Sequence, residues 1–175
     1  MKRCLRCQAR FDQSGWTCPH CGHTPAQSRS VPVFAPALAE GDGSDAEYRF
    51  ERLADAQSWH FWFVRRAMLL SWALQRYFPL AENFLEVGCG TGGVSSALSA
   101  ALPGLKVTAG DTRLAGLEFA KRRSQRIDIV QCDAANLPFD SEFDVAGAFD
   151  VIEHLDDDAR ALAAMRDVVK PAAES

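Results

Sequence analysis

The chain has 175 residues, of which 47% are hydrophobic and 24% are charged, and its formal net charge is −4. This composition predicts a folded core over most of the length. The negative charge argues against a general nucleic-acid binder, but five basic residues accompany a single acid within residues 1–30, which leaves an anionic partner open at this basic tip.

No apolar run suited to a secretory signal follows Lys2 and Arg3, and the longest apolar tract, residues 61–74, is interrupted by Arg65 and Arg66. This tract falls short of the roughly 20 apolar residues that a membrane-spanning helix needs. We therefore expect a soluble, cytoplasmic protein without a membrane span. In a reducing compartment its six cysteines are expected to be metal ligands or free thiols rather than disulfides.

Residues 1–24 contain two Cys-x-x-Cys pairs, and the segment resembles a short zinc ribbon. Four thiolates suit tetrahedral Zn²⁺. A unit this short cannot fold on apolar burial alone, so the metal would supply most of its folding energy. The expected ligands are Cys4, Cys7, Cys18 and Cys21. Cys89 and Cys132 have no cysteine or histidine partner nearby in the sequence and are expected to be bystanders.

Residues 25–44 carry three prolines and two glycines without a sustained hydrophobic period, which predicts a linker. Residues 45–79 are expected to form a cap of two helices, with a turn within residues 58–61 and a stop at Pro79.

From residue 80 onward, strand-like runs alternate with helical patterns. The expected strands are residues 84–87, 106–110, 127–131 and 143–149, and the expected helices are residues 94–102, 114–124 and 157–169. This alternation predicts right-handed βαβ units and an α/β, doubly wound parallel sheet of the Rossmann-like type.

The first of these strands ends in a turn with four glycines within six positions. Glycine lets the backbone turn tightly and approach a ligand, and the helix that follows offers free N–H groups at its N-terminus. Gly88, Gly90 and Gly93 fit the G-x-G-x-x-G pattern of dinucleotide-binding proteins. From this turn alone, an NAD-dependent oxidoreductase therefore remains an alternative.

An acidic residue stands at the end of each expected strand: Glu86, Asp111, Asp133 and Asp150. The carboxyl ends of strands in a doubly wound sheet line one crevice. Four acids at one rim repel each other unless a donor-rich ligand lies between them. A nucleoside that carries a sulfonium and an ammonium group suits these acids better than a pyrophosphate does.

The motifs that carry the resemblance to a known family occur in the order 86–92, Asp111, 132–139, 143–145, 150–155 and 169–171. In this order they resemble the motifs of class I S-adenosylmethionine (SAM)-dependent methyltransferases, over about residues 60–171. The resemblance implies an enzyme that transfers a methyl group from SAM to an acceptor that the sequence does not identify.

The resemblance also implies roles for single residues. The glycine turn would hold the methionine end of SAM, Glu86 its ammonium group, Asp111 the two ribose hydroxyls and Asp133 the adenine amino group. The full expected cofactor set is Glu86, Gly88, Gly90, Gly92, Asp111, Thr112, Asp133, Ala134 and Leu137. Asp150 and His154 would lie near the methyl group and its acceptor, with His154 as a candidate general base.

The family normally continues after residue 171 with Gly-Gly and three more strands, whereas this chain ends at Ser175. The resemblance therefore implies an incomplete SAM-binding domain over residues 80–175, with strand order 3-2-1-4 and an open fourth strand. We expect Leu162, Met165, Val168 and Val169 to be partly uncovered, the chain to self-associate through that edge, and methyl transfer to be weak or absent. A non-enzymatic SAM-binding or zinc-ribbon interaction protein, or an inactive remnant, is the alternative.

Overall fold

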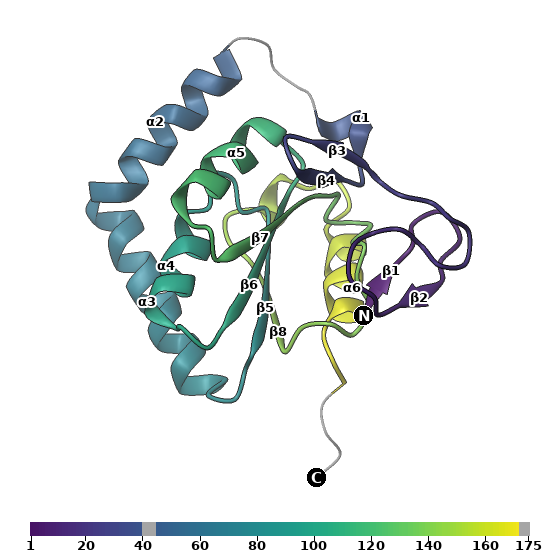
Figure 1. The fold of residues 1–175 in the computed structure, drawn as a ribbon. Coiled ribbons are helices and arrows are strands. Elements are labelled where there is room, and N and C mark those ends of the chain that lie inside the picture. The colour runs from purple at the N-terminus through teal and green to yellow at the C-terminus, as the bar shows by residue number, and fades with distance from the viewer. Residues whose placement is uncertain (40–44, 172–175) are drawn as a thin grey trace.

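The computed structural model describes residues 1–39 and 45–171. Its centre is a six-stranded sheet in the order β3-β4-β7-β6-β5-β8 (Figure 1). Four adjacent strands are parallel to one another: β5 (Asn83–Val87), β6 (Lys106–Asp111), β7 (Ile127–Gln131) and β8 (Val145–Ala148). They match the four strands expected from the sequence, so the α/β class and the predicted order 3-2-1-4, counted from β5, are confirmed.

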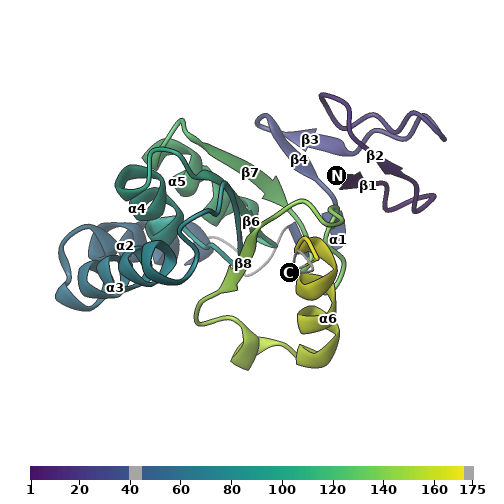
Figure 2. The ribbon, with the colours of Figure 1, turned by 90° about the horizontal axis from the view of Figure 1, so that it is seen from below.

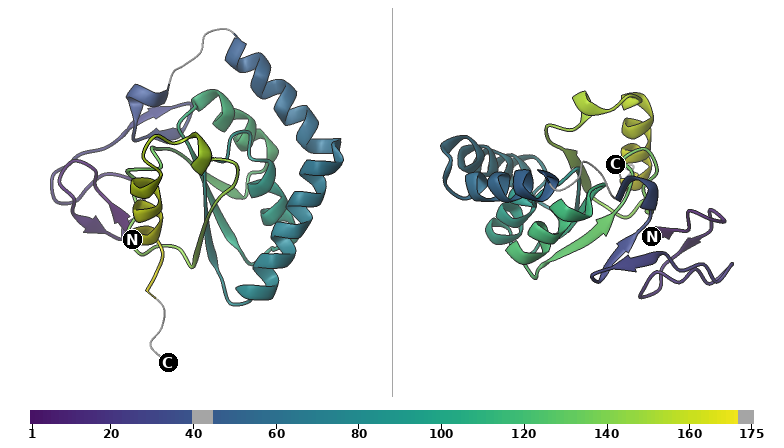
Figure 3. Two further views of the ribbon diagram at one scale, coloured as in Figure 1. Left: turned by 180° about the vertical axis from the view of Figure 1, so that it is seen from behind. Right: turned by 90° about the horizontal axis from the view of Figure 1, so that it is seen from above.

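Helices cover both faces of this sheet. On one face lie α4 (Gly93–Ala101) and α5 (Leu114–Arg123), with α2 (Asp45–Trp59) and α3 (Phe61–Tyr77) packed against them from outside (Figure 2). On the other face lies α6 (Asp158–Val168), which Figure 3 shows from behind. The expected pair of helices before the sheet is therefore present. Within the described ranges, none of the helices is long and apolar enough to cross a membrane.

Each face of the sheet has its own apolar core. Phe84 packs with Leu98 and Leu117 beneath α4 and α5, whereas its neighbour Leu85 packs with Val168 beneath α6. Successive strand residues point to opposite faces, so a strand covered on both sides is apolar at every position. This explains the adjacent apolar residues Phe84 and Leu85 of β5, which Glu86 follows.

The last helix is better covered than the sequence indicated. Val168 is fully buried, so the expectation that it lies partly uncovered is wrong. The expectation holds for Leu162, which is 52% exposed, and for Met165 and Val169, which are half-buried. In the described part of the chain, β8 has a strand partner only in β5. Self-association through the other edge of β8 stays a prediction.

The N-terminal segment is joined to the sheet. Strands β1 (Lys2–Arg3) and β2 (Arg10–Phe11) form a small antiparallel sheet. They are followed by a hairpin of β3 (Ala26–Ser28) and β4 (Val31–Val33), and by α1 (Pro36–Ala39). The prediction that residues 25–44 form a linker without regular structure is therefore wrong for residues 26–39, while residues 40–44 lie outside the described ranges.

The side chain of Gln131 explains why this hairpin is held in place. Gln131 is fully buried, its Oε1 accepts from the Ala35 N–H at 2.9 Å, and its Nε2 donates to the Ala35 carbonyl at 2.8 Å. A parallel bridge between Val33 and Gln131 joins β4 to β7. A buried amide needs such partners, and here the backbone after β4 supplies them.

Candidate functional site

The candidate site lies at the carboxyl edge of the parallel strands, where β5 passes into α4. The N–H groups of Gly88 and Cys89 both donate to the Gly110 carbonyl, at 2.8 and 3.0 Å, and fix the start of the turn against β6. Gly88, Gly90 and Gly92 have φ values of 75°, 53° and 72°. Only glycine adopts this left-handed conformation at little cost, so the turn depends on these residue types.

Close neighbours add a second constraint on two of these glycines. A Cβ at Gly88 would clash with Val151 Cγ2, and a Cβ at Gly92 would lie 2.6 Å from Ala120 Cβ. A Cβ at Gly90 would have no atom of the described chain within 4 Å. Gly88 and Gly92 thus let the turn pack closely against Val151 and Ala120, whereas Gly90 faces open space that is available to a ligand.

Asp111 joins the end of β6 to this turn. Its Oδ2 accepts from the Gly90 N–H at 2.8 Å, and its Oδ1 accepts from the Arg113 N–H at 2.9 Å. Burial raises the pKa of Asp111, and these N–H donors act in the opposite direction. A hydrogen bond therefore connects the Asp111 carboxylate directly to the glycine turn, and the two form one continuous edge.

Glu86 lies beneath the turn and is only 3% exposed. Ser95 in α4 donates to its carboxylate. Burial raises the pKa of Glu86 to about 7, while the hydrogen bonds from Ser95 and the positive charge of Arg66 act to lower it. A positively charged ligand beside this carboxylate would stabilise its ionised form.

The segment after β7 carries the residues expected at adenine. Asp133 Oδ1 accepts from the Ala135 N–H at 2.9 Å, and the Asn136 N–H donates to the Asp133 carbonyl at 3.0 Å, which closes a tight turn. Ala134 is buried and Leu137 is fully buried in the core beneath α6. Thr112 is half-buried, and its carbonyl accepts from Gln131 Nε2 at 2.9 Å.

The two residues expected near the acceptor lie on the loop after β8. Asp150 accepts from Arg66 Nη1, and its own φ is 58°. His154 ends the short helix η1 (Ile152–His154) and is exposed. Because Val151 of the same loop contacts Gly88, the loop reaches the glycine turn.

Two residues from the outer helices also contact this edge. Gln57 of α2 accepts from Thr91 Oγ1 at 2.6 Å and from Arg123 at 3.2 Å, so it supports the turn from outside. Arg66 of α3 pairs with Asp150, and its Nε is buried without a hydrogen-bond partner among the described residues. Neither residue belongs to a motif, so periodicity gives no signal for them.

A groove of about 520 Å³ opens beside the turn, between α3 and α4. Its walls include Met68 and Trp72 from α3, Gly93 and Ala97 from α4, and Gln57. The groove is bounded mainly by helices and includes none of the strand-end acids. The groove therefore borders the glycine turn at Gly93 without reaching the strand-end acids.

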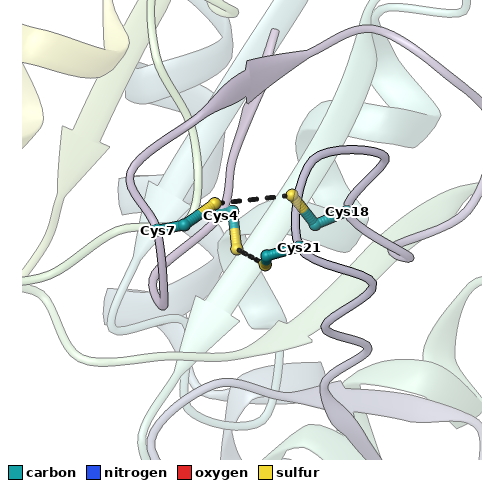
Figure 4. A group of neighbouring side chains, drawn as sticks. All are labelled: Cys4, Cys7, Cys18 and Cys21. Carbon is teal, nitrogen blue, oxygen red and sulfur yellow. Dashed lines mark hydrogen bonds between the residues drawn. The ribbon is translucent and has the colours of Figure 1, made fainter.

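The four cysteines of the N-terminal segment come together, as Figure 4 shows. Their sulfur atoms all lie within 4.8 Å of one another, and the pairs Cys4–Cys21 and Cys7–Cys18 are each separated by 3.7 Å. Zinc–sulfur bonds of about 2.3 Å place the sulfurs of a tetrahedral site about 3.8 Å apart. The observed spacing therefore fits a tetrahedral metal ion.

Both Cys-x-x-Cys pairs have the same backbone closure. The Gln8 N–H donates to the Cys4 carbonyl at 2.8 Å, and the Gly22 N–H donates to the Cys18 carbonyl at 2.9 Å. Gln8 and Gly22 both have positive φ, 62° and 68°. The two halves of the segment thus present their thiols in the same way.

The remaining two cysteines lie outside this cluster. Cys89 and Cys132 are buried, and burial raises the pKa of each thiol above its usual range. A thiol that stays protonated is a poor ligand and a poor nucleophile, which is consistent with the expected bystander role.

Comparison with known proteins identifies relatives for this arrangement. The family described as "Methyltransferase domain" matches residues 85–174, about half of the chain. UbiE from Desulfotalea psychrophila, a ubiquinone/menaquinone biosynthesis C-methyltransferase, is 35% identical over 96 residues, which cover 53% of this chain and 39% of that protein. Rv3030 of Mycobacterium tuberculosis, described as a probable S-adenosylmethionine-dependent methyltransferase, is 30% identical over 151 residues, which cover 82% and 51%.

A solved structure shares the fold. SAM-bound CalS10, an amino pentose methyltransferase from Micromonospora echinaspora, superimposes with a TM-score of 0.57 at 24% identity, covering 75% of this chain and 53% of that chain. The present chain spans about half or less of the length of the two curated relatives above.

Proposed function

The chain belongs to the methyltransferase domain family of class I, SAM-dependent methyltransferases, and from this premise we propose that it binds SAM at the glycine turn and transfers the methyl group to an acceptor. One observation carries the proposal: the Gly90 N–H donates to Asp111, so the turn and the acid at the end of β6 form a continuous edge. The open space at Gly90 supports a ligand that lies along this edge.

We assign the parts of SAM to the residues around that edge. Glu86 takes the ammonium group and the backbone of the glycine turn takes the rest of the methionine part. Asp111 accepts from the ribose hydroxyls. The adenine lies against the segment of Asp133 and Ala134, with Thr112 beside it, while the fully buried Leu137 packs in the core with Ala134. SAM supplies an electrophilic methyl group, and in-line transfer depends mainly on positioning.

On the acceptor side, we assign His154 as a general base for an acceptor that must lose a proton. It is exposed, so an acceptor has access to its imidazole. Asp150 is held by Arg66 from α3, which ties the loop after β8 to the outer helices. Relatives named for quinone-biosynthesis C-methylation and for amino pentose methylation indicate the first acceptor classes to screen.

Calorimetry with SAM, S-adenosylhomocysteine and NAD tests the cofactor assignment. We expect SAM and S-adenosylhomocysteine to bind with one site per chain and NAD to give no heat. Preferential binding of NAD would instead favour the alternative of an NAD-dependent oxidoreductase. SAM binding without S-adenosylhomocysteine formation across a broad acceptor panel would favour a non-enzymatic SAM-binding protein.

Glu86 gives a prediction that depends on pH. Its pKa is about 7 in the folded chain and 4.5 as an ordinary glutamate. Between these values the folded chain binds more protons than the unfolded chain, so the free energy of unfolding falls as the pH rises. Glu86→Gln removes this cost and should stabilise the protein at pH 8, by about 3 kcal/mol at most, with little gain near pH 5.

Thermal melts of Glu86→Gln at both pH values check this prediction, with the exposed Glu51→Gln as the matched control. The same variant should bind SAM more weakly, because the neutral amide no longer attracts the ammonium group. A melting temperature lowered equally at pH 5 and pH 8 would contradict the assigned role of burial at Glu86.

We also propose that the cysteine cluster holds a structural zinc ion, which fits its sulfur spacing. Purified protein should contain about one zinc ion per chain. Cys18→Ser, which removes a buried thiol, should lower the zinc content to near zero, whereas Cys132→Ser should leave it unchanged. Metal analysis of the three proteins decides. A metal-free wild-type chain whose N-terminal amides exchange slowly would refute the zinc assignment.

A further inference from the structure

The segment of residues 1–24, called the ribbon below, is bonded to the stretch 137–140 that follows the expected adenine turn. Lys2 and Phe139 form an antiparallel bridge. The Arg3 N–H donates to the Pro138 carbonyl at 3.0 Å, and Arg3 Nη2 donates to the Leu137 carbonyl at 2.8 Å. These contacts come from the residues immediately before Cys4, the first of the four clustered cysteines.

Other parts of the ribbon contact the same stretch. The Trp16 ring meets Phe139 edge to face at 5.5 Å between centroids, and it meets Phe34 at 4.7 Å. Arg10 Nε pairs with the buried Asp140 at 2.9 Å. Trp16 stands two residues before Cys18, so both halves of the cysteine cluster are linked to residues 137–140.

This stretch ends a short loop that carries the assigned adenine contacts. At its start, the Cys132 N–H donates to the Asp111 carbonyl at 3.0 Å, and Asp133 then closes its tight turn. Only a few residues separate Asp133 from Leu137, whose carbonyl the ribbon binds. The loop is therefore fixed at one end by the sheet and at the other end by the ribbon.

The ribbon depends on its metal site for this contact to persist. Its buried apolar core consists of Cys4, Phe11 and Cys18, with Ala9 packed against them. So few apolar residues cannot balance the conformational entropy of the segment, and two of the three core residues belong to the cysteine cluster. Loss of the metal should therefore unfold the ribbon and release residues 137–140.

We propose that Arg3 and Trp16 of the ribbon are positioning residues for the adenine loop, so that the metal and SAM each favour binding of the other. The inference rests on the assignment of Asp133 and Ala134 to the cofactor under the proposed function. Coupling between two sites is reciprocal. The metal should thus raise the affinity for SAM, and SAM should raise the affinity for the metal by the same factor.

The test uses the full chain with zinc bound, and S-adenosylhomocysteine as the probe. Trp16→Ala keeps all four cysteines, so it should retain one zinc ion per chain and still bind the probe at least about 5-fold more weakly, within the usual range of coupling. Arg3→Ala is the second variant, for the case that Trp16→Ala fails to fold. Tyr77→Ala, which removes an exposed ring at the end of α3, is the matched control and should bind like wild type.

Hydrogen exchange gives a readout that needs no cofactor. In wild type, removal of zinc by a chelator should speed exchange of the amides of Leu137, Phe139 and Asp140, while the amides of β5 stay protected. In equilibrium competition with a chromogenic chelator, the zinc affinity of the chain should be higher when the probe is saturating.

Each of the following results would overturn a stated part of the proposal. Equal probe affinity in wild type, Trp16→Ala and Arg3→Ala, together with unchanged exchange after zinc removal, would overturn the coupling and leave the SAM site standing. A wild-type chain that binds no probe would overturn both. An equilibrium zinc affinity that is the same with and without the probe would also overturn the reciprocal link.

Discussion

Replacing Asp111 by alanine is expected to weaken SAM binding by about 10–100-fold, which corresponds to about 1.5–3 kcal/mol. The carboxylate is proposed to accept from both ribose hydroxyls, and hydrogen bonds to a charged acceptor are worth more than neutral ones. Its loss also leaves the Gly90 and Arg113 N–H groups without their present acceptor. Both effects act in the same direction.

Calorimetric titration of Asp111→Ala with SAM measures the change. Asp128→Ala is the control, because Asp128 is an exposed acid on the neighbouring strand β7 and is paired in register with Thr108, away from the carboxyl ends of the strands. Asp133→Ala should cost less, since water can replace a single contact to an amino group. Unchanged affinity in Asp111→Ala would contradict the ribose assignment.

The parallel sheet could be predicted because its elements follow local rules. β7 has the predicted bounds, and the other three parallel strands agree in position, although β8 is shorter at both ends than predicted. Short apolar strands between helical patterns leave few arrangements, and right-handed crossovers then fix the strand order. The glycine turn was also visible, because its backbone conformation demands glycine.

The N-terminal hairpin could not be predicted in the same way. β4 is a three-residue strand with Pro32 at its centre, and its link to the sheet is a single bridge to Gln131. What holds it is a buried amide about a hundred residues away, which no local period reveals. The hydrogen bonds of Arg3 and the ring contacts of Trp16 were missed for the same reason: each joins residues far apart in the sequence.

The residues of the candidate site also fall into these two groups: those that local sequence rules predict and those that only the tertiary structure reveals. Asp111 was expected from its place after a strand, and its contact with the glycine turn agrees with that expectation. Gln57 and Arg66 come from the outer helices, where a polar residue on an exposed helix face is the ordinary case. Only the tertiary packing of α2 and α3 turns these side chains towards the turn and the loop after β8.

The paired variants Gly92→Ala and Gly90→Ala are expected to separate stability from ligand binding. At Gly92 the new Cβ would meet Ala120 Cβ at 2.6 Å and the Ala120 Cα at 2.8 Å, so α4 and α5 must move apart. Overpacking and the left-handed φ together should cost about 2–4 kcal/mol. For a chain of this size the melting temperature should fall by about 5–15 °C.

Gly90 has a similar φ, but its Cβ would meet no described atom within 4 Å. Gly90→Ala should therefore cost only the conformational strain, about 1–2 kcal/mol, and lower the melting temperature by about 2–8 °C. Its methyl group would enter the space that we assign to SAM. The loss of SAM affinity should thus be larger in Gly90→Ala than expected from its small loss of stability.

Thermal melts and SAM titrations of both variants give the comparison. A double variant with Ala120→Gly should lose less stability than the sum of the single changes, because removal of the Ala120 methyl group relieves one of the two contacts at Gly92. The backbone contact remains, so the relief should be partial. If Gly90→Ala bound SAM like wild type while losing as much stability as Gly92→Ala, the turn would be a structural device only, and the ligand would have to lie elsewhere.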